Sequence, residues 1–279
     1  MTGILYLVAS PIGNLEDITF RAVRVLKECD LIACEDTRHT RTLLNHYGID
    51  KPLVSYHDHN EATRSSELIA RLLDGASVAL VSDAGTPLVA DPGYRVVNAA
   101  VAAGIPVQSI PGPAALITAL AGSGLPTDAF RFIGFLPARS GQRGAVLETL
   151  RAEQATVICY EAPHRILDTL ADIDRILGAR PVVVGRELTK THEEFLRGTA
   201  LEILEILKAR HSVKGEITLL IGKAGKKDAQ PSDQTSVEEA VAAHLRGGMP
   251  RMDAIKAVAR LRGLSKREVY QLINVTPKK

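Results

Sequence analysis

The sequence predicts an α/β protein with two lobes, each built on a mainly parallel sheet, followed by a small helical extension. Short β-branched or apolar runs alternate with stretches of about a dozen residues that have helical periodicity. Turn residues such as Gly, Pro, Asn and Asp follow most of the apolar runs. The 279 residues are enough for two domains, and alternation of this kind favours parallel strands with helices on both faces.

The first lobe is expected to span residues 1–121. Its strands are predicted at 4–8, 31–34, 53–55, 78–81 and 107–110. Helices are expected at 19–27, in a segment that ends at Tyr47, and at 61–73, 94–103 and 114–121. The small residues of 122–126 then predict a domain boundary.

The second lobe is expected at 122–225, with strands at 130–135, 156–160, 181–185 and 217–221. Its helices are predicted at 144–151, 165–177 and 200–209. The polar segment 226–236 is typical of a linker, and residues 237–279 carry helical patterns at 237–246, 250–262 and 266–273. Ser265 and Glu268 form a capping-box pattern, and the extension resembles a helix-turn-helix in outline.

The charge distribution indicates a polyanionic partner. From residue 240 onward there are nine Lys or Arg against two acidic residues, so this end carries about +7, whereas the rest carries about −5. Aromatic residues make up 4% of the chain, so base stacking on an aromatic platform is not expected to dominate. Three cysteines without a CxxC pair, and no apolar run of about 18 residues, indicate a cytoplasmic protein without a membrane span.

The stretch VALVSDAGTPLVADPG at 78–93 is the most informative one for function. Asp83 and Gly85 follow a buried strand, where α/β sheets bind ligands. Similar strand-end loops are predicted at 10–14, 111–115 and 161–165, and residues 185–194 are densely ionisable. The sequence lacks GxGxxG after the first strand and lacks GxxxxGK[ST], which counts against an ordinary Rossmann dinucleotide enzyme and against a P-loop NTPase. Spacing alone leaves an active site and a solvated surface equally open.

Seven segments together resemble the small-subunit ribosomal RNA cytidine 2′-O-methyltransferases of the tetrapyrrole methylase superfamily: LVASPIGNLEDIT, ACEDTRHT, SYHDHNE, VSDAGTPLVADPG, IPGPAA, YEAPHR and GRELTKTHEE. The resemblance implies S-adenosylmethionine between two lobes, no metal and a homodimer. It also implies methylation of the ribose 2′-hydroxyl of a decoding-region cytidine in 16S ribosomal RNA. The cofactor-binding positions that it implies are Pro11, Val81, Ser82, Asp83, Thr86, Ala114, Ala115, Glu161 and Leu188.

Ionisable residues of the strand-end segments are candidates for orienting and deprotonating the ribose hydroxyl: Glu35, Asp36, Arg38, Glu161, His164, Arg186, Glu187 and Lys190. Structural roles are equally open for His164, as a cap, and for Glu187 with Lys190, as an ion pair. Basic residues of the extension are expected to contact RNA phosphates: Arg251, Arg262, Lys266 and Arg267. Two alternatives remain, a corrin-pathway C-methyltransferase and a non-catalytic RNA-binding protein of ribosome assembly.

Overall fold

The computed structural model describes residues 2–225, 237–246, 249–262 and 264–273. The chain divides into two compact units, Met1–Ala224 and Gly225–Lys279, and each is described here by itself. The first unit contains two five-stranded sheets flanked by helices, which confirms the predicted α/β class. Among the described residues, none of the helices has the length and apolarity that crossing a membrane requires.

The first sheet has the strand order β3-β2-β4-β1-β5, and all of its strands are parallel. Its strands are β1 (Leu5–Val8), β2 (Leu31–Cys34), β3 (Leu53–Ser55), β4 (Val78–Val81) and β5 (Val107–Ile110). The central strands β2 and β4 are buried along their whole length, because helices cover both faces of the sheet.

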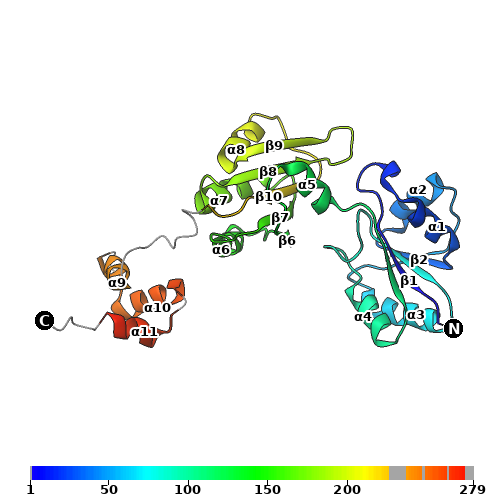
Figure 1. Ribbon diagram of the computed structural model, residues 1–279, viewed down its shortest axis with the longest axis horizontal. Helices are drawn as coiled ribbons and strands as arrows, with labels where there is room; N and C mark the ends of the chain where they lie inside the picture. The colour runs from blue at the N-terminus through cyan, green and yellow to red at the C-terminus, as the bar shows by residue number, and fades with distance from the viewer. Residues whose placement is uncertain (1, 226–236, 247–248, 263, 274–279) are drawn as a thin grey trace. The chain divides into compact units, whose positions relative to one another are not determined.

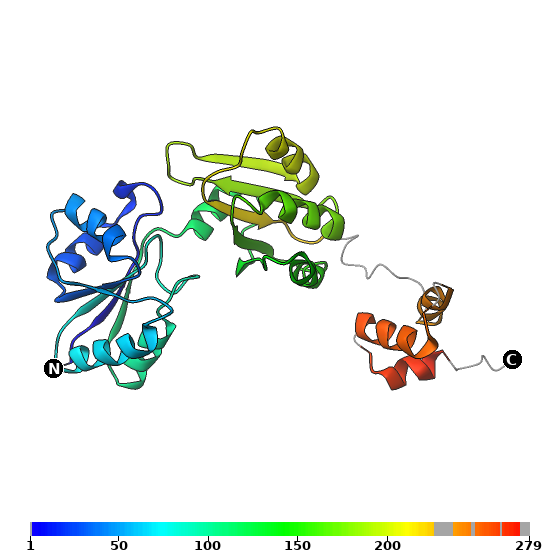
Figure 2. The same ribbon diagram turned by 180° about the vertical axis from the view of Figure 1, so that it is seen from behind.

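Four helices and a 3₁₀ turn connect these strands: η1 (Leu15–Asp17), α1 (Phe20–Glu28), α2 (Thr37–His46), α3 (Glu61–Leu73) and α4 (Tyr94–Ala102). Helices α1 and α2 pack on one face of the sheet and α3 and α4 on the other (Figures 1 and 2). Each helix is amphipathic and buries its apolar side against the strands. The carboxyl ends of the parallel strands therefore meet at one edge.

The second sheet corrects the expectation of a mainly parallel arrangement. Its order is β6-β7-β10-β8-β9, and only β6 and β7 are parallel. The strands are β6 (Phe130–Phe135), β7 (Thr156–Glu161), β8 (Pro181–Arg186), β9 (Glu194–Thr199) and β10 (Ile217–Ile221). Strand β9 is absent from the prediction, and it pairs antiparallel with β8 across a short ionisable loop.

Helices α6 (Ser140–Thr149), α7 (Ile166–Leu177) and α8 (Ala200–Lys208) cover one face of this sheet. Helix α6 begins four residues before the predicted start. The other face packs against α5 (Ala115–Ser123) through Leu116, Ala119 and Leu120. The chain thus passes to the second sheet before the turn at 122–126 where the domain boundary is expected, since α5 packs with the second lobe rather than the first.

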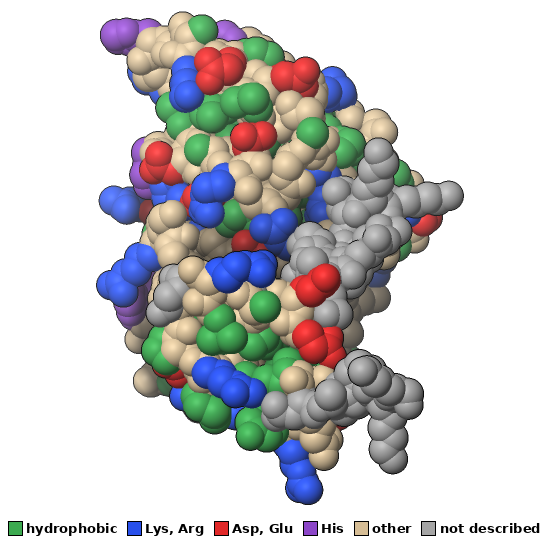
Figure 3. All heavy atoms as spheres, turned by 90° about the vertical axis from the view of Figure 1, so that its left-hand side faces the viewer, with side chains coloured by type: hydrophobic (Ala, Val, Ile, Leu, Met, Phe, Trp, Pro, Cys, Tyr) green, Lys and Arg blue, Asp and Glu red, His purple; other side chains and the backbone are tan. Residues whose placement is uncertain are grey.

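The second unit contains α9 (Val237–Arg246), α10 (Arg251–Arg262) and α11 (Lys266–Leu272). Apolar side chains of all three helices form its core, with Ile255, Val258 and Val269 almost fully buried. The predicted capping box at α11 is confirmed, because Ser265 and Glu268 bond each other's backbone amides. On the face that Figure 3 shows, Lys and Arg side chains are interspersed with Asp and Glu side chains. The expected linker at 226–236 lies outside the described residues.

Candidate functional site

Hydrogen bonds tie together the loops that follow the strands of the first sheet. The backbone groups of Ser10, after β1, and Gly85, after β4, bond each other in both directions, at 2.9 and 3.1 Å. The Ser10 hydroxyl donates to the Ser82 carbonyl at 3.0 Å. Gly85 has φ +83°, a conformation that L-residues other than Gly rarely adopt, so this tight approach of the two loops requires glycine.

Two further loops join this edge. The Asp36 backbone amide, after β2, donates to Asp83 at 3.0 Å. The Thr86 hydroxyl donates to the Pro113 carbonyl, after β5, at 3.1 Å. The loops after four parallel strands thus form one connected surface, at the edge where α/β sheets bind ligands.

A cavity of about 370 Å³ lies at this edge, within the size range of small-molecule sites. One part of its wall comes from the loops of the first sheet and from the start of α5: Ile12, Ala84, Gly85, Thr86, Val89, Ala90, Asp91, Ala114 and Ala115. The other part comes from the second sheet and its loops: Phe135, Tyr160, Glu161, Ala162, Pro163, Gly215, Glu216, Ile217 and Thr218. The site is therefore assembled between the two sheets of the first unit.

Four of the nine predicted cofactor positions line this cavity: Thr86, Ala114, Ala115 and Glu161. The other five are outside the set of described residues that line it: Pro11, Val81, Ser82, Asp83 and Leu188. Val81 and Leu188 are buried in apolar clusters. The Ser82 hydroxyl donates to the Gly85 carbonyl of its own loop, and the Asp83 carboxylate accepts a bond from the Asp36 amide of the loop after β2.

Asp91 is a cavity residue that the sequence-based prediction missed. Burial, together with the negative charge of Glu35, raises the pKa of the Asp91 carboxyl to about 6. Burial and the charge of Asp83 also raise the pKa of Glu35. The cavity therefore carries a carboxylate in a negative field, which favours a cationic or hydrogen-bond-donating ligand. The Asp91-Pro92-Gly93 break in the sequence is the one signal that could have identified it.

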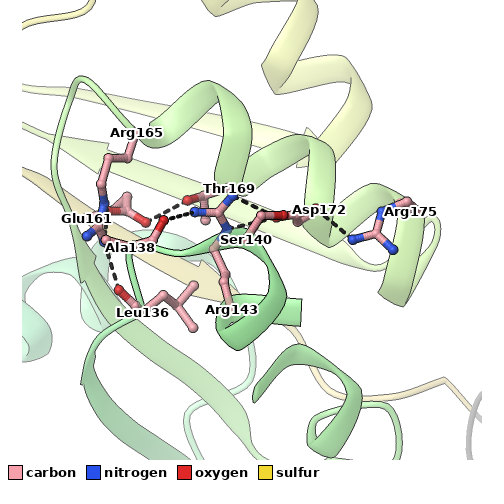
Figure 4. A network of polar contacts seen from close by, with 9 residues as sticks. All are labelled: Leu136, Ala138, Ser140, Arg143, Glu161, Arg165, Thr169, Asp172 and Arg175. Carbon is pink, nitrogen blue, oxygen red and sulfur yellow. Dashed lines mark hydrogen bonds and ion pairs between the residues drawn. The ribbon is translucent and has the colours of Figure 1, made fainter. Parts of the chain in front are cut away.

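Glu161 lies at the centre of a buried polar network (Figure 4). Its side chain is 0% exposed and accepts hydrogen bonds from the Ala162 amide (2.8 Å), Arg165 (2.7 Å) and the Thr169 hydroxyl (2.6 Å). Arg165 also donates to the Leu136 carbonyl at 2.8 Å, which joins the loops after β6 and β7. The Glu161 carboxylate therefore fixes the position of the cavity wall through this buried network.

The same face of α7 continues this network away from the cavity. Asp172 pairs with the buried Arg143 at 2.7 Å and with Arg175 at 2.7 Å, and it accepts a bond from the Ser140 hydroxyl at 3.1 Å (Figure 4). Desolvation alone would raise the pKa of Asp172, but hydrogen bonds from Arg175, Arg143 and Ser140 hold it below its usual range. The helix is thereby fixed to α6.

Most of the other predicted catalytic residues have protein partners. Asp36 caps α2 and pairs with Arg38, whose side chain is 90% exposed. Arg186 pairs with Glu194. Glu187 and Lys190 pair at 2.9 Å, the alternative considered from the sequence. His164 is exposed and adjoins Pro163 in the cavity wall.

The predicted RNA contacts lie in the second unit. Lys266 and Arg267 are exposed in the first turn of α11, and Arg251 is exposed at the start of α10. Arg262 ends α10, and its side chain lies outside the described part of the structure. Lys266 and Arg267 therefore offer adjacent positive charges to a phosphate backbone.

The structure provides no grouping of three or more His, Cys, Asp or Glu side chains suited to a metal ion within the described residues. Cys29, Cys34 and Cys159 are buried as free thiols, and burial raises the pKa of each. They are therefore packing residues rather than nucleophiles.

Comparison with known proteins places this chain in a family of methylases. Residues 4–204 match the family of tetrapyrrole (corrin/porphyrin) methylases. The chain is 50% identical over 274 residues to the ribosomal RNA small subunit methyltransferase I of Halalkalibacterium halodurans, covering 97% of this chain and 94% of that protein. It is 47% identical over 271 residues to the protein of the same name from Synechocystis, covering 97% of both.

The fold is shared with a solved uroporphyrin-III C-methyl transferase from Thermus thermophilus, complexed with S-adenyl homocysteine. The TM-score is 0.54 at 19% sequence identity, and the match covers 78% of this chain and 97% of that one. At this identity the likeness concerns the fold alone.

Proposed function

Because the chain belongs to the tetrapyrrole (corrin/porphyrin) methylases, we propose that it methylates small-subunit ribosomal RNA, with S-adenosylmethionine as the donor. The acceptor we propose is the ribose 2′-hydroxyl of a cytidine in the decoding region of 16S RNA. The observation that carries the proposal is the cavity between the two sheets, in a chain about half identical to proteins named for this RNA. The basic α11, as part of an extension with a net positive charge, favours a polyanionic substrate over a small macrocycle.

The cavity residues suit this donor. Ala84, Gly85, Ala114 and Ala115 present small side chains, so a ribose or an adenine ring could approach the backbone closely. Asp91 offers a carboxylate to a hydroxyl or ammonium group, and its surroundings favour a cation. When bound, the donor supplies an electrophilic methyl group on a sulfonium sulfur. The residues that would hold it are Thr86, Asp91, Ala114 and Ala115.

The protein's own contribution is alignment, exclusion of water and removal of one proton. The Glu161 network fixes the wall at Ala162 and Pro163, so that the reacting groups could be held at about 3–3.5 Å, which provides much of the acceleration. The ribose hydroxyl is a weak acid, and a positioned base typically adds about 10²–10⁴-fold. Among the candidates, His164 directly follows Pro163 of that wall and is exposed, so an RNA bound at the cavity could reach it.

The direct test maps 2′-O-methyl groups on 16S RNA from cells with and without the protein. One cytidine of the decoding region should lose its methyl group in the deletion strain and regain it on complementation. Complementation with His164→Ala should leave that cytidine largely unmethylated, although the variant still binds S-adenosylhomocysteine. A methylation map that is identical in both strains would refute the proposed function, and full methylation by His164→Ala would remove this residue from the mechanism.

The proposal also includes the assembly and location of the protein. We expect a homodimer in the cytoplasm that acts on 16S RNA or on the small ribosomal subunit, with the second unit contacting phosphates. Light scattering of the purified chain tests whether it is a homodimer, since a dimer of a 30.0 kDa chain has twice that mass.

A further inference from the structure

Three aromatic rings meet along one side of the cavity. The Tyr160 ring lies 4.9 Å from the Phe132 ring and 5.7 Å from the Phe135 ring, in both cases edge to face. Phe135 and Tyr160 line the cavity, whereas Phe132 packs with the apolar cluster behind it. This is a concentration of aromatic side chains in a chain that has few of them.

The backbone presents Phe135 to the cavity. The register of β6 against β7 shifts between Phe132 and Phe135, which marks a β-bulge. Gly134, between them, has φ +66°, so the strand can bend there at little cost. Without the bulge, Phe132 and the residue three positions later would point to opposite faces of the sheet, yet both rings contact Tyr160.

Phe135 remains 58% exposed although its ring borders a cavity. Tyr160, by contrast, is half-buried, and burial raises its pKa, so its hydroxyl stays protonated and can donate a hydrogen bond. A large apolar ring left open beside a polar donor and a carboxylate is typical of a site that binds a flat partner with polar edges.

We propose that the exposed Phe135 ring, which Tyr160 supports edge to face, is a stacking platform for a nucleobase at the mouth of the cavity. The base could be that of the target nucleotide in the RNA or the adenine of the donor, because both present the same heteroaromatic face. Either ring would cover the exposed side of Phe135 and leave its polar edge directed toward Asp91 or the Tyr160 hydroxyl. This inference rests on the proposed function for the identity of the RNA, but the platform itself rests on the geometry of the rings.

The test compares Phe135→Leu, which keeps apolar area but removes the ring, with Phe135→Tyr, which keeps the ring. Phe130→Leu is the matched control, because Phe130 lies on the same strand with 44% exposure and is not a cavity residue. For each full-length variant, calorimetry measures the affinity for S-adenosylhomocysteine and for a short cytidine-containing RNA. Initial rates give KM and kcat with small-subunit RNA, and the calorimetric stoichiometry corrects for any unfolded protein.

Phe135→Leu should weaken one of the two ligands by roughly 5- to 150-fold, and Phe135→Tyr and Phe130→Leu should stay within twofold of wild type. Loss of RNA affinity with unchanged S-adenosylhomocysteine binding identifies the RNA base, and the reverse identifies the adenine. The platform is refuted if Phe135→Leu binds both ligands like wild type, or if Phe135→Tyr is as weak as Phe135→Leu. If the wild-type protein methylates no RNA, the proposed function fails, whereas the two binding measurements still decide the role of the ring.

Discussion

Replacing Glu161 separates a supporting role from a chemical one. The side chain is fully buried, and three groups donate to its oxygens: the Ala162 amide, the Arg165 guanidinium and the Thr169 hydroxyl. Glu161→Ala leaves Arg165 with the Leu136 carbonyl as a remaining acceptor and leaves the buried Thr169 hydroxyl without its partner.

Breaking a buried ion pair by removing one partner costs about 3–5 kcal/mol. The Arg165 side chain is 20% exposed and can partly rehydrate, so Glu161→Ala should lower the free energy of unfolding by about 3 kcal/mol, the lower end of this range. Glu161→Gln keeps the shape but loses the charge, so about 1.5–3 kcal/mol is expected. The control is Glu148→Gln, whose exposed pair with Arg151 is worth about 0–1 kcal/mol.

Equilibrium unfolding in urea measures these free energies, and methyl transfer to RNA is measured on the same samples per folded molecule. If Glu161 only supports the wall, the alanine and glutamine variants lose stability while the folded fraction keeps partial turnover. The supporting role is contradicted if Glu161→Gln is as stable as wild type but inactive, because a direct chemical role would then be required.

Three further predictions concern charge. The pKa of Asp91 is raised to about 6, so the ionised carboxylate destabilises the ligand-free fold above that pH. Asp91→Asn should therefore unfold at a higher temperature than wild type at pH 7–8. This gain in unfolding temperature should shrink as the pH falls from 6 to 4. A gain that grows on acidification would contradict the assignment. Hydrogen bonds from Arg210 and Arg186 lower the pKa of Glu194 to about 2. Glu194→Gln should therefore lower the free energy of unfolding at neutral pH, and this loss should fade as the pH drops from 4.5 toward 2. An equal loss at pH 3 and at pH 7 would contradict the lowered pKa of Glu194. The double variant Lys266→Ala, Arg267→Ala should make the slope of log RNA affinity against log salt concentration shallower by about 1.4–1.8. Its affinity for S-adenosylhomocysteine should stay unchanged. An unchanged slope would show that these two residues of α11 do not contact phosphates.

The first sheet could be predicted closely because strands such as β2 and β4 are short apolar runs between turn residues. Strands β4 and β5 match their predicted bounds. The second sheet could not be predicted as well. Strands β8 and β10 are buried on both faces and have the continuous apolar character that also marks parallel strands, so the pattern carries no information on direction. Strand β9 mixes charged residues with Gly198 at a sheet edge and gives little periodic signal.

The candidate site shows the same limit. Strand-end loops could be located from the sequence, and three of the predicted cofactor positions, Thr86, Ala114 and Ala115, line the cavity. Phe135 and Tyr160 could not be selected, because their contact depends on a bulge in β6 and on pairing with β7. The sequence also cannot distinguish a carboxylate that faces a ligand from one that is enclosed by its neighbours, as Glu161 is.

The loop after β1 holds the two sheets of the first unit against each other. Ile12 is 6% exposed and packs in the apolar cluster formed by α5 and the second sheet, and the Lys190 side chain lies directly against Gly13. Swinging the two sheets apart would return Ile12 to water at about 1.5–3 kcal/mol and would pull Lys190 from its place. This cost favours the closed arrangement of the two sheets by roughly 10- to 150-fold, so the cavity is already formed in most molecules before a ligand binds.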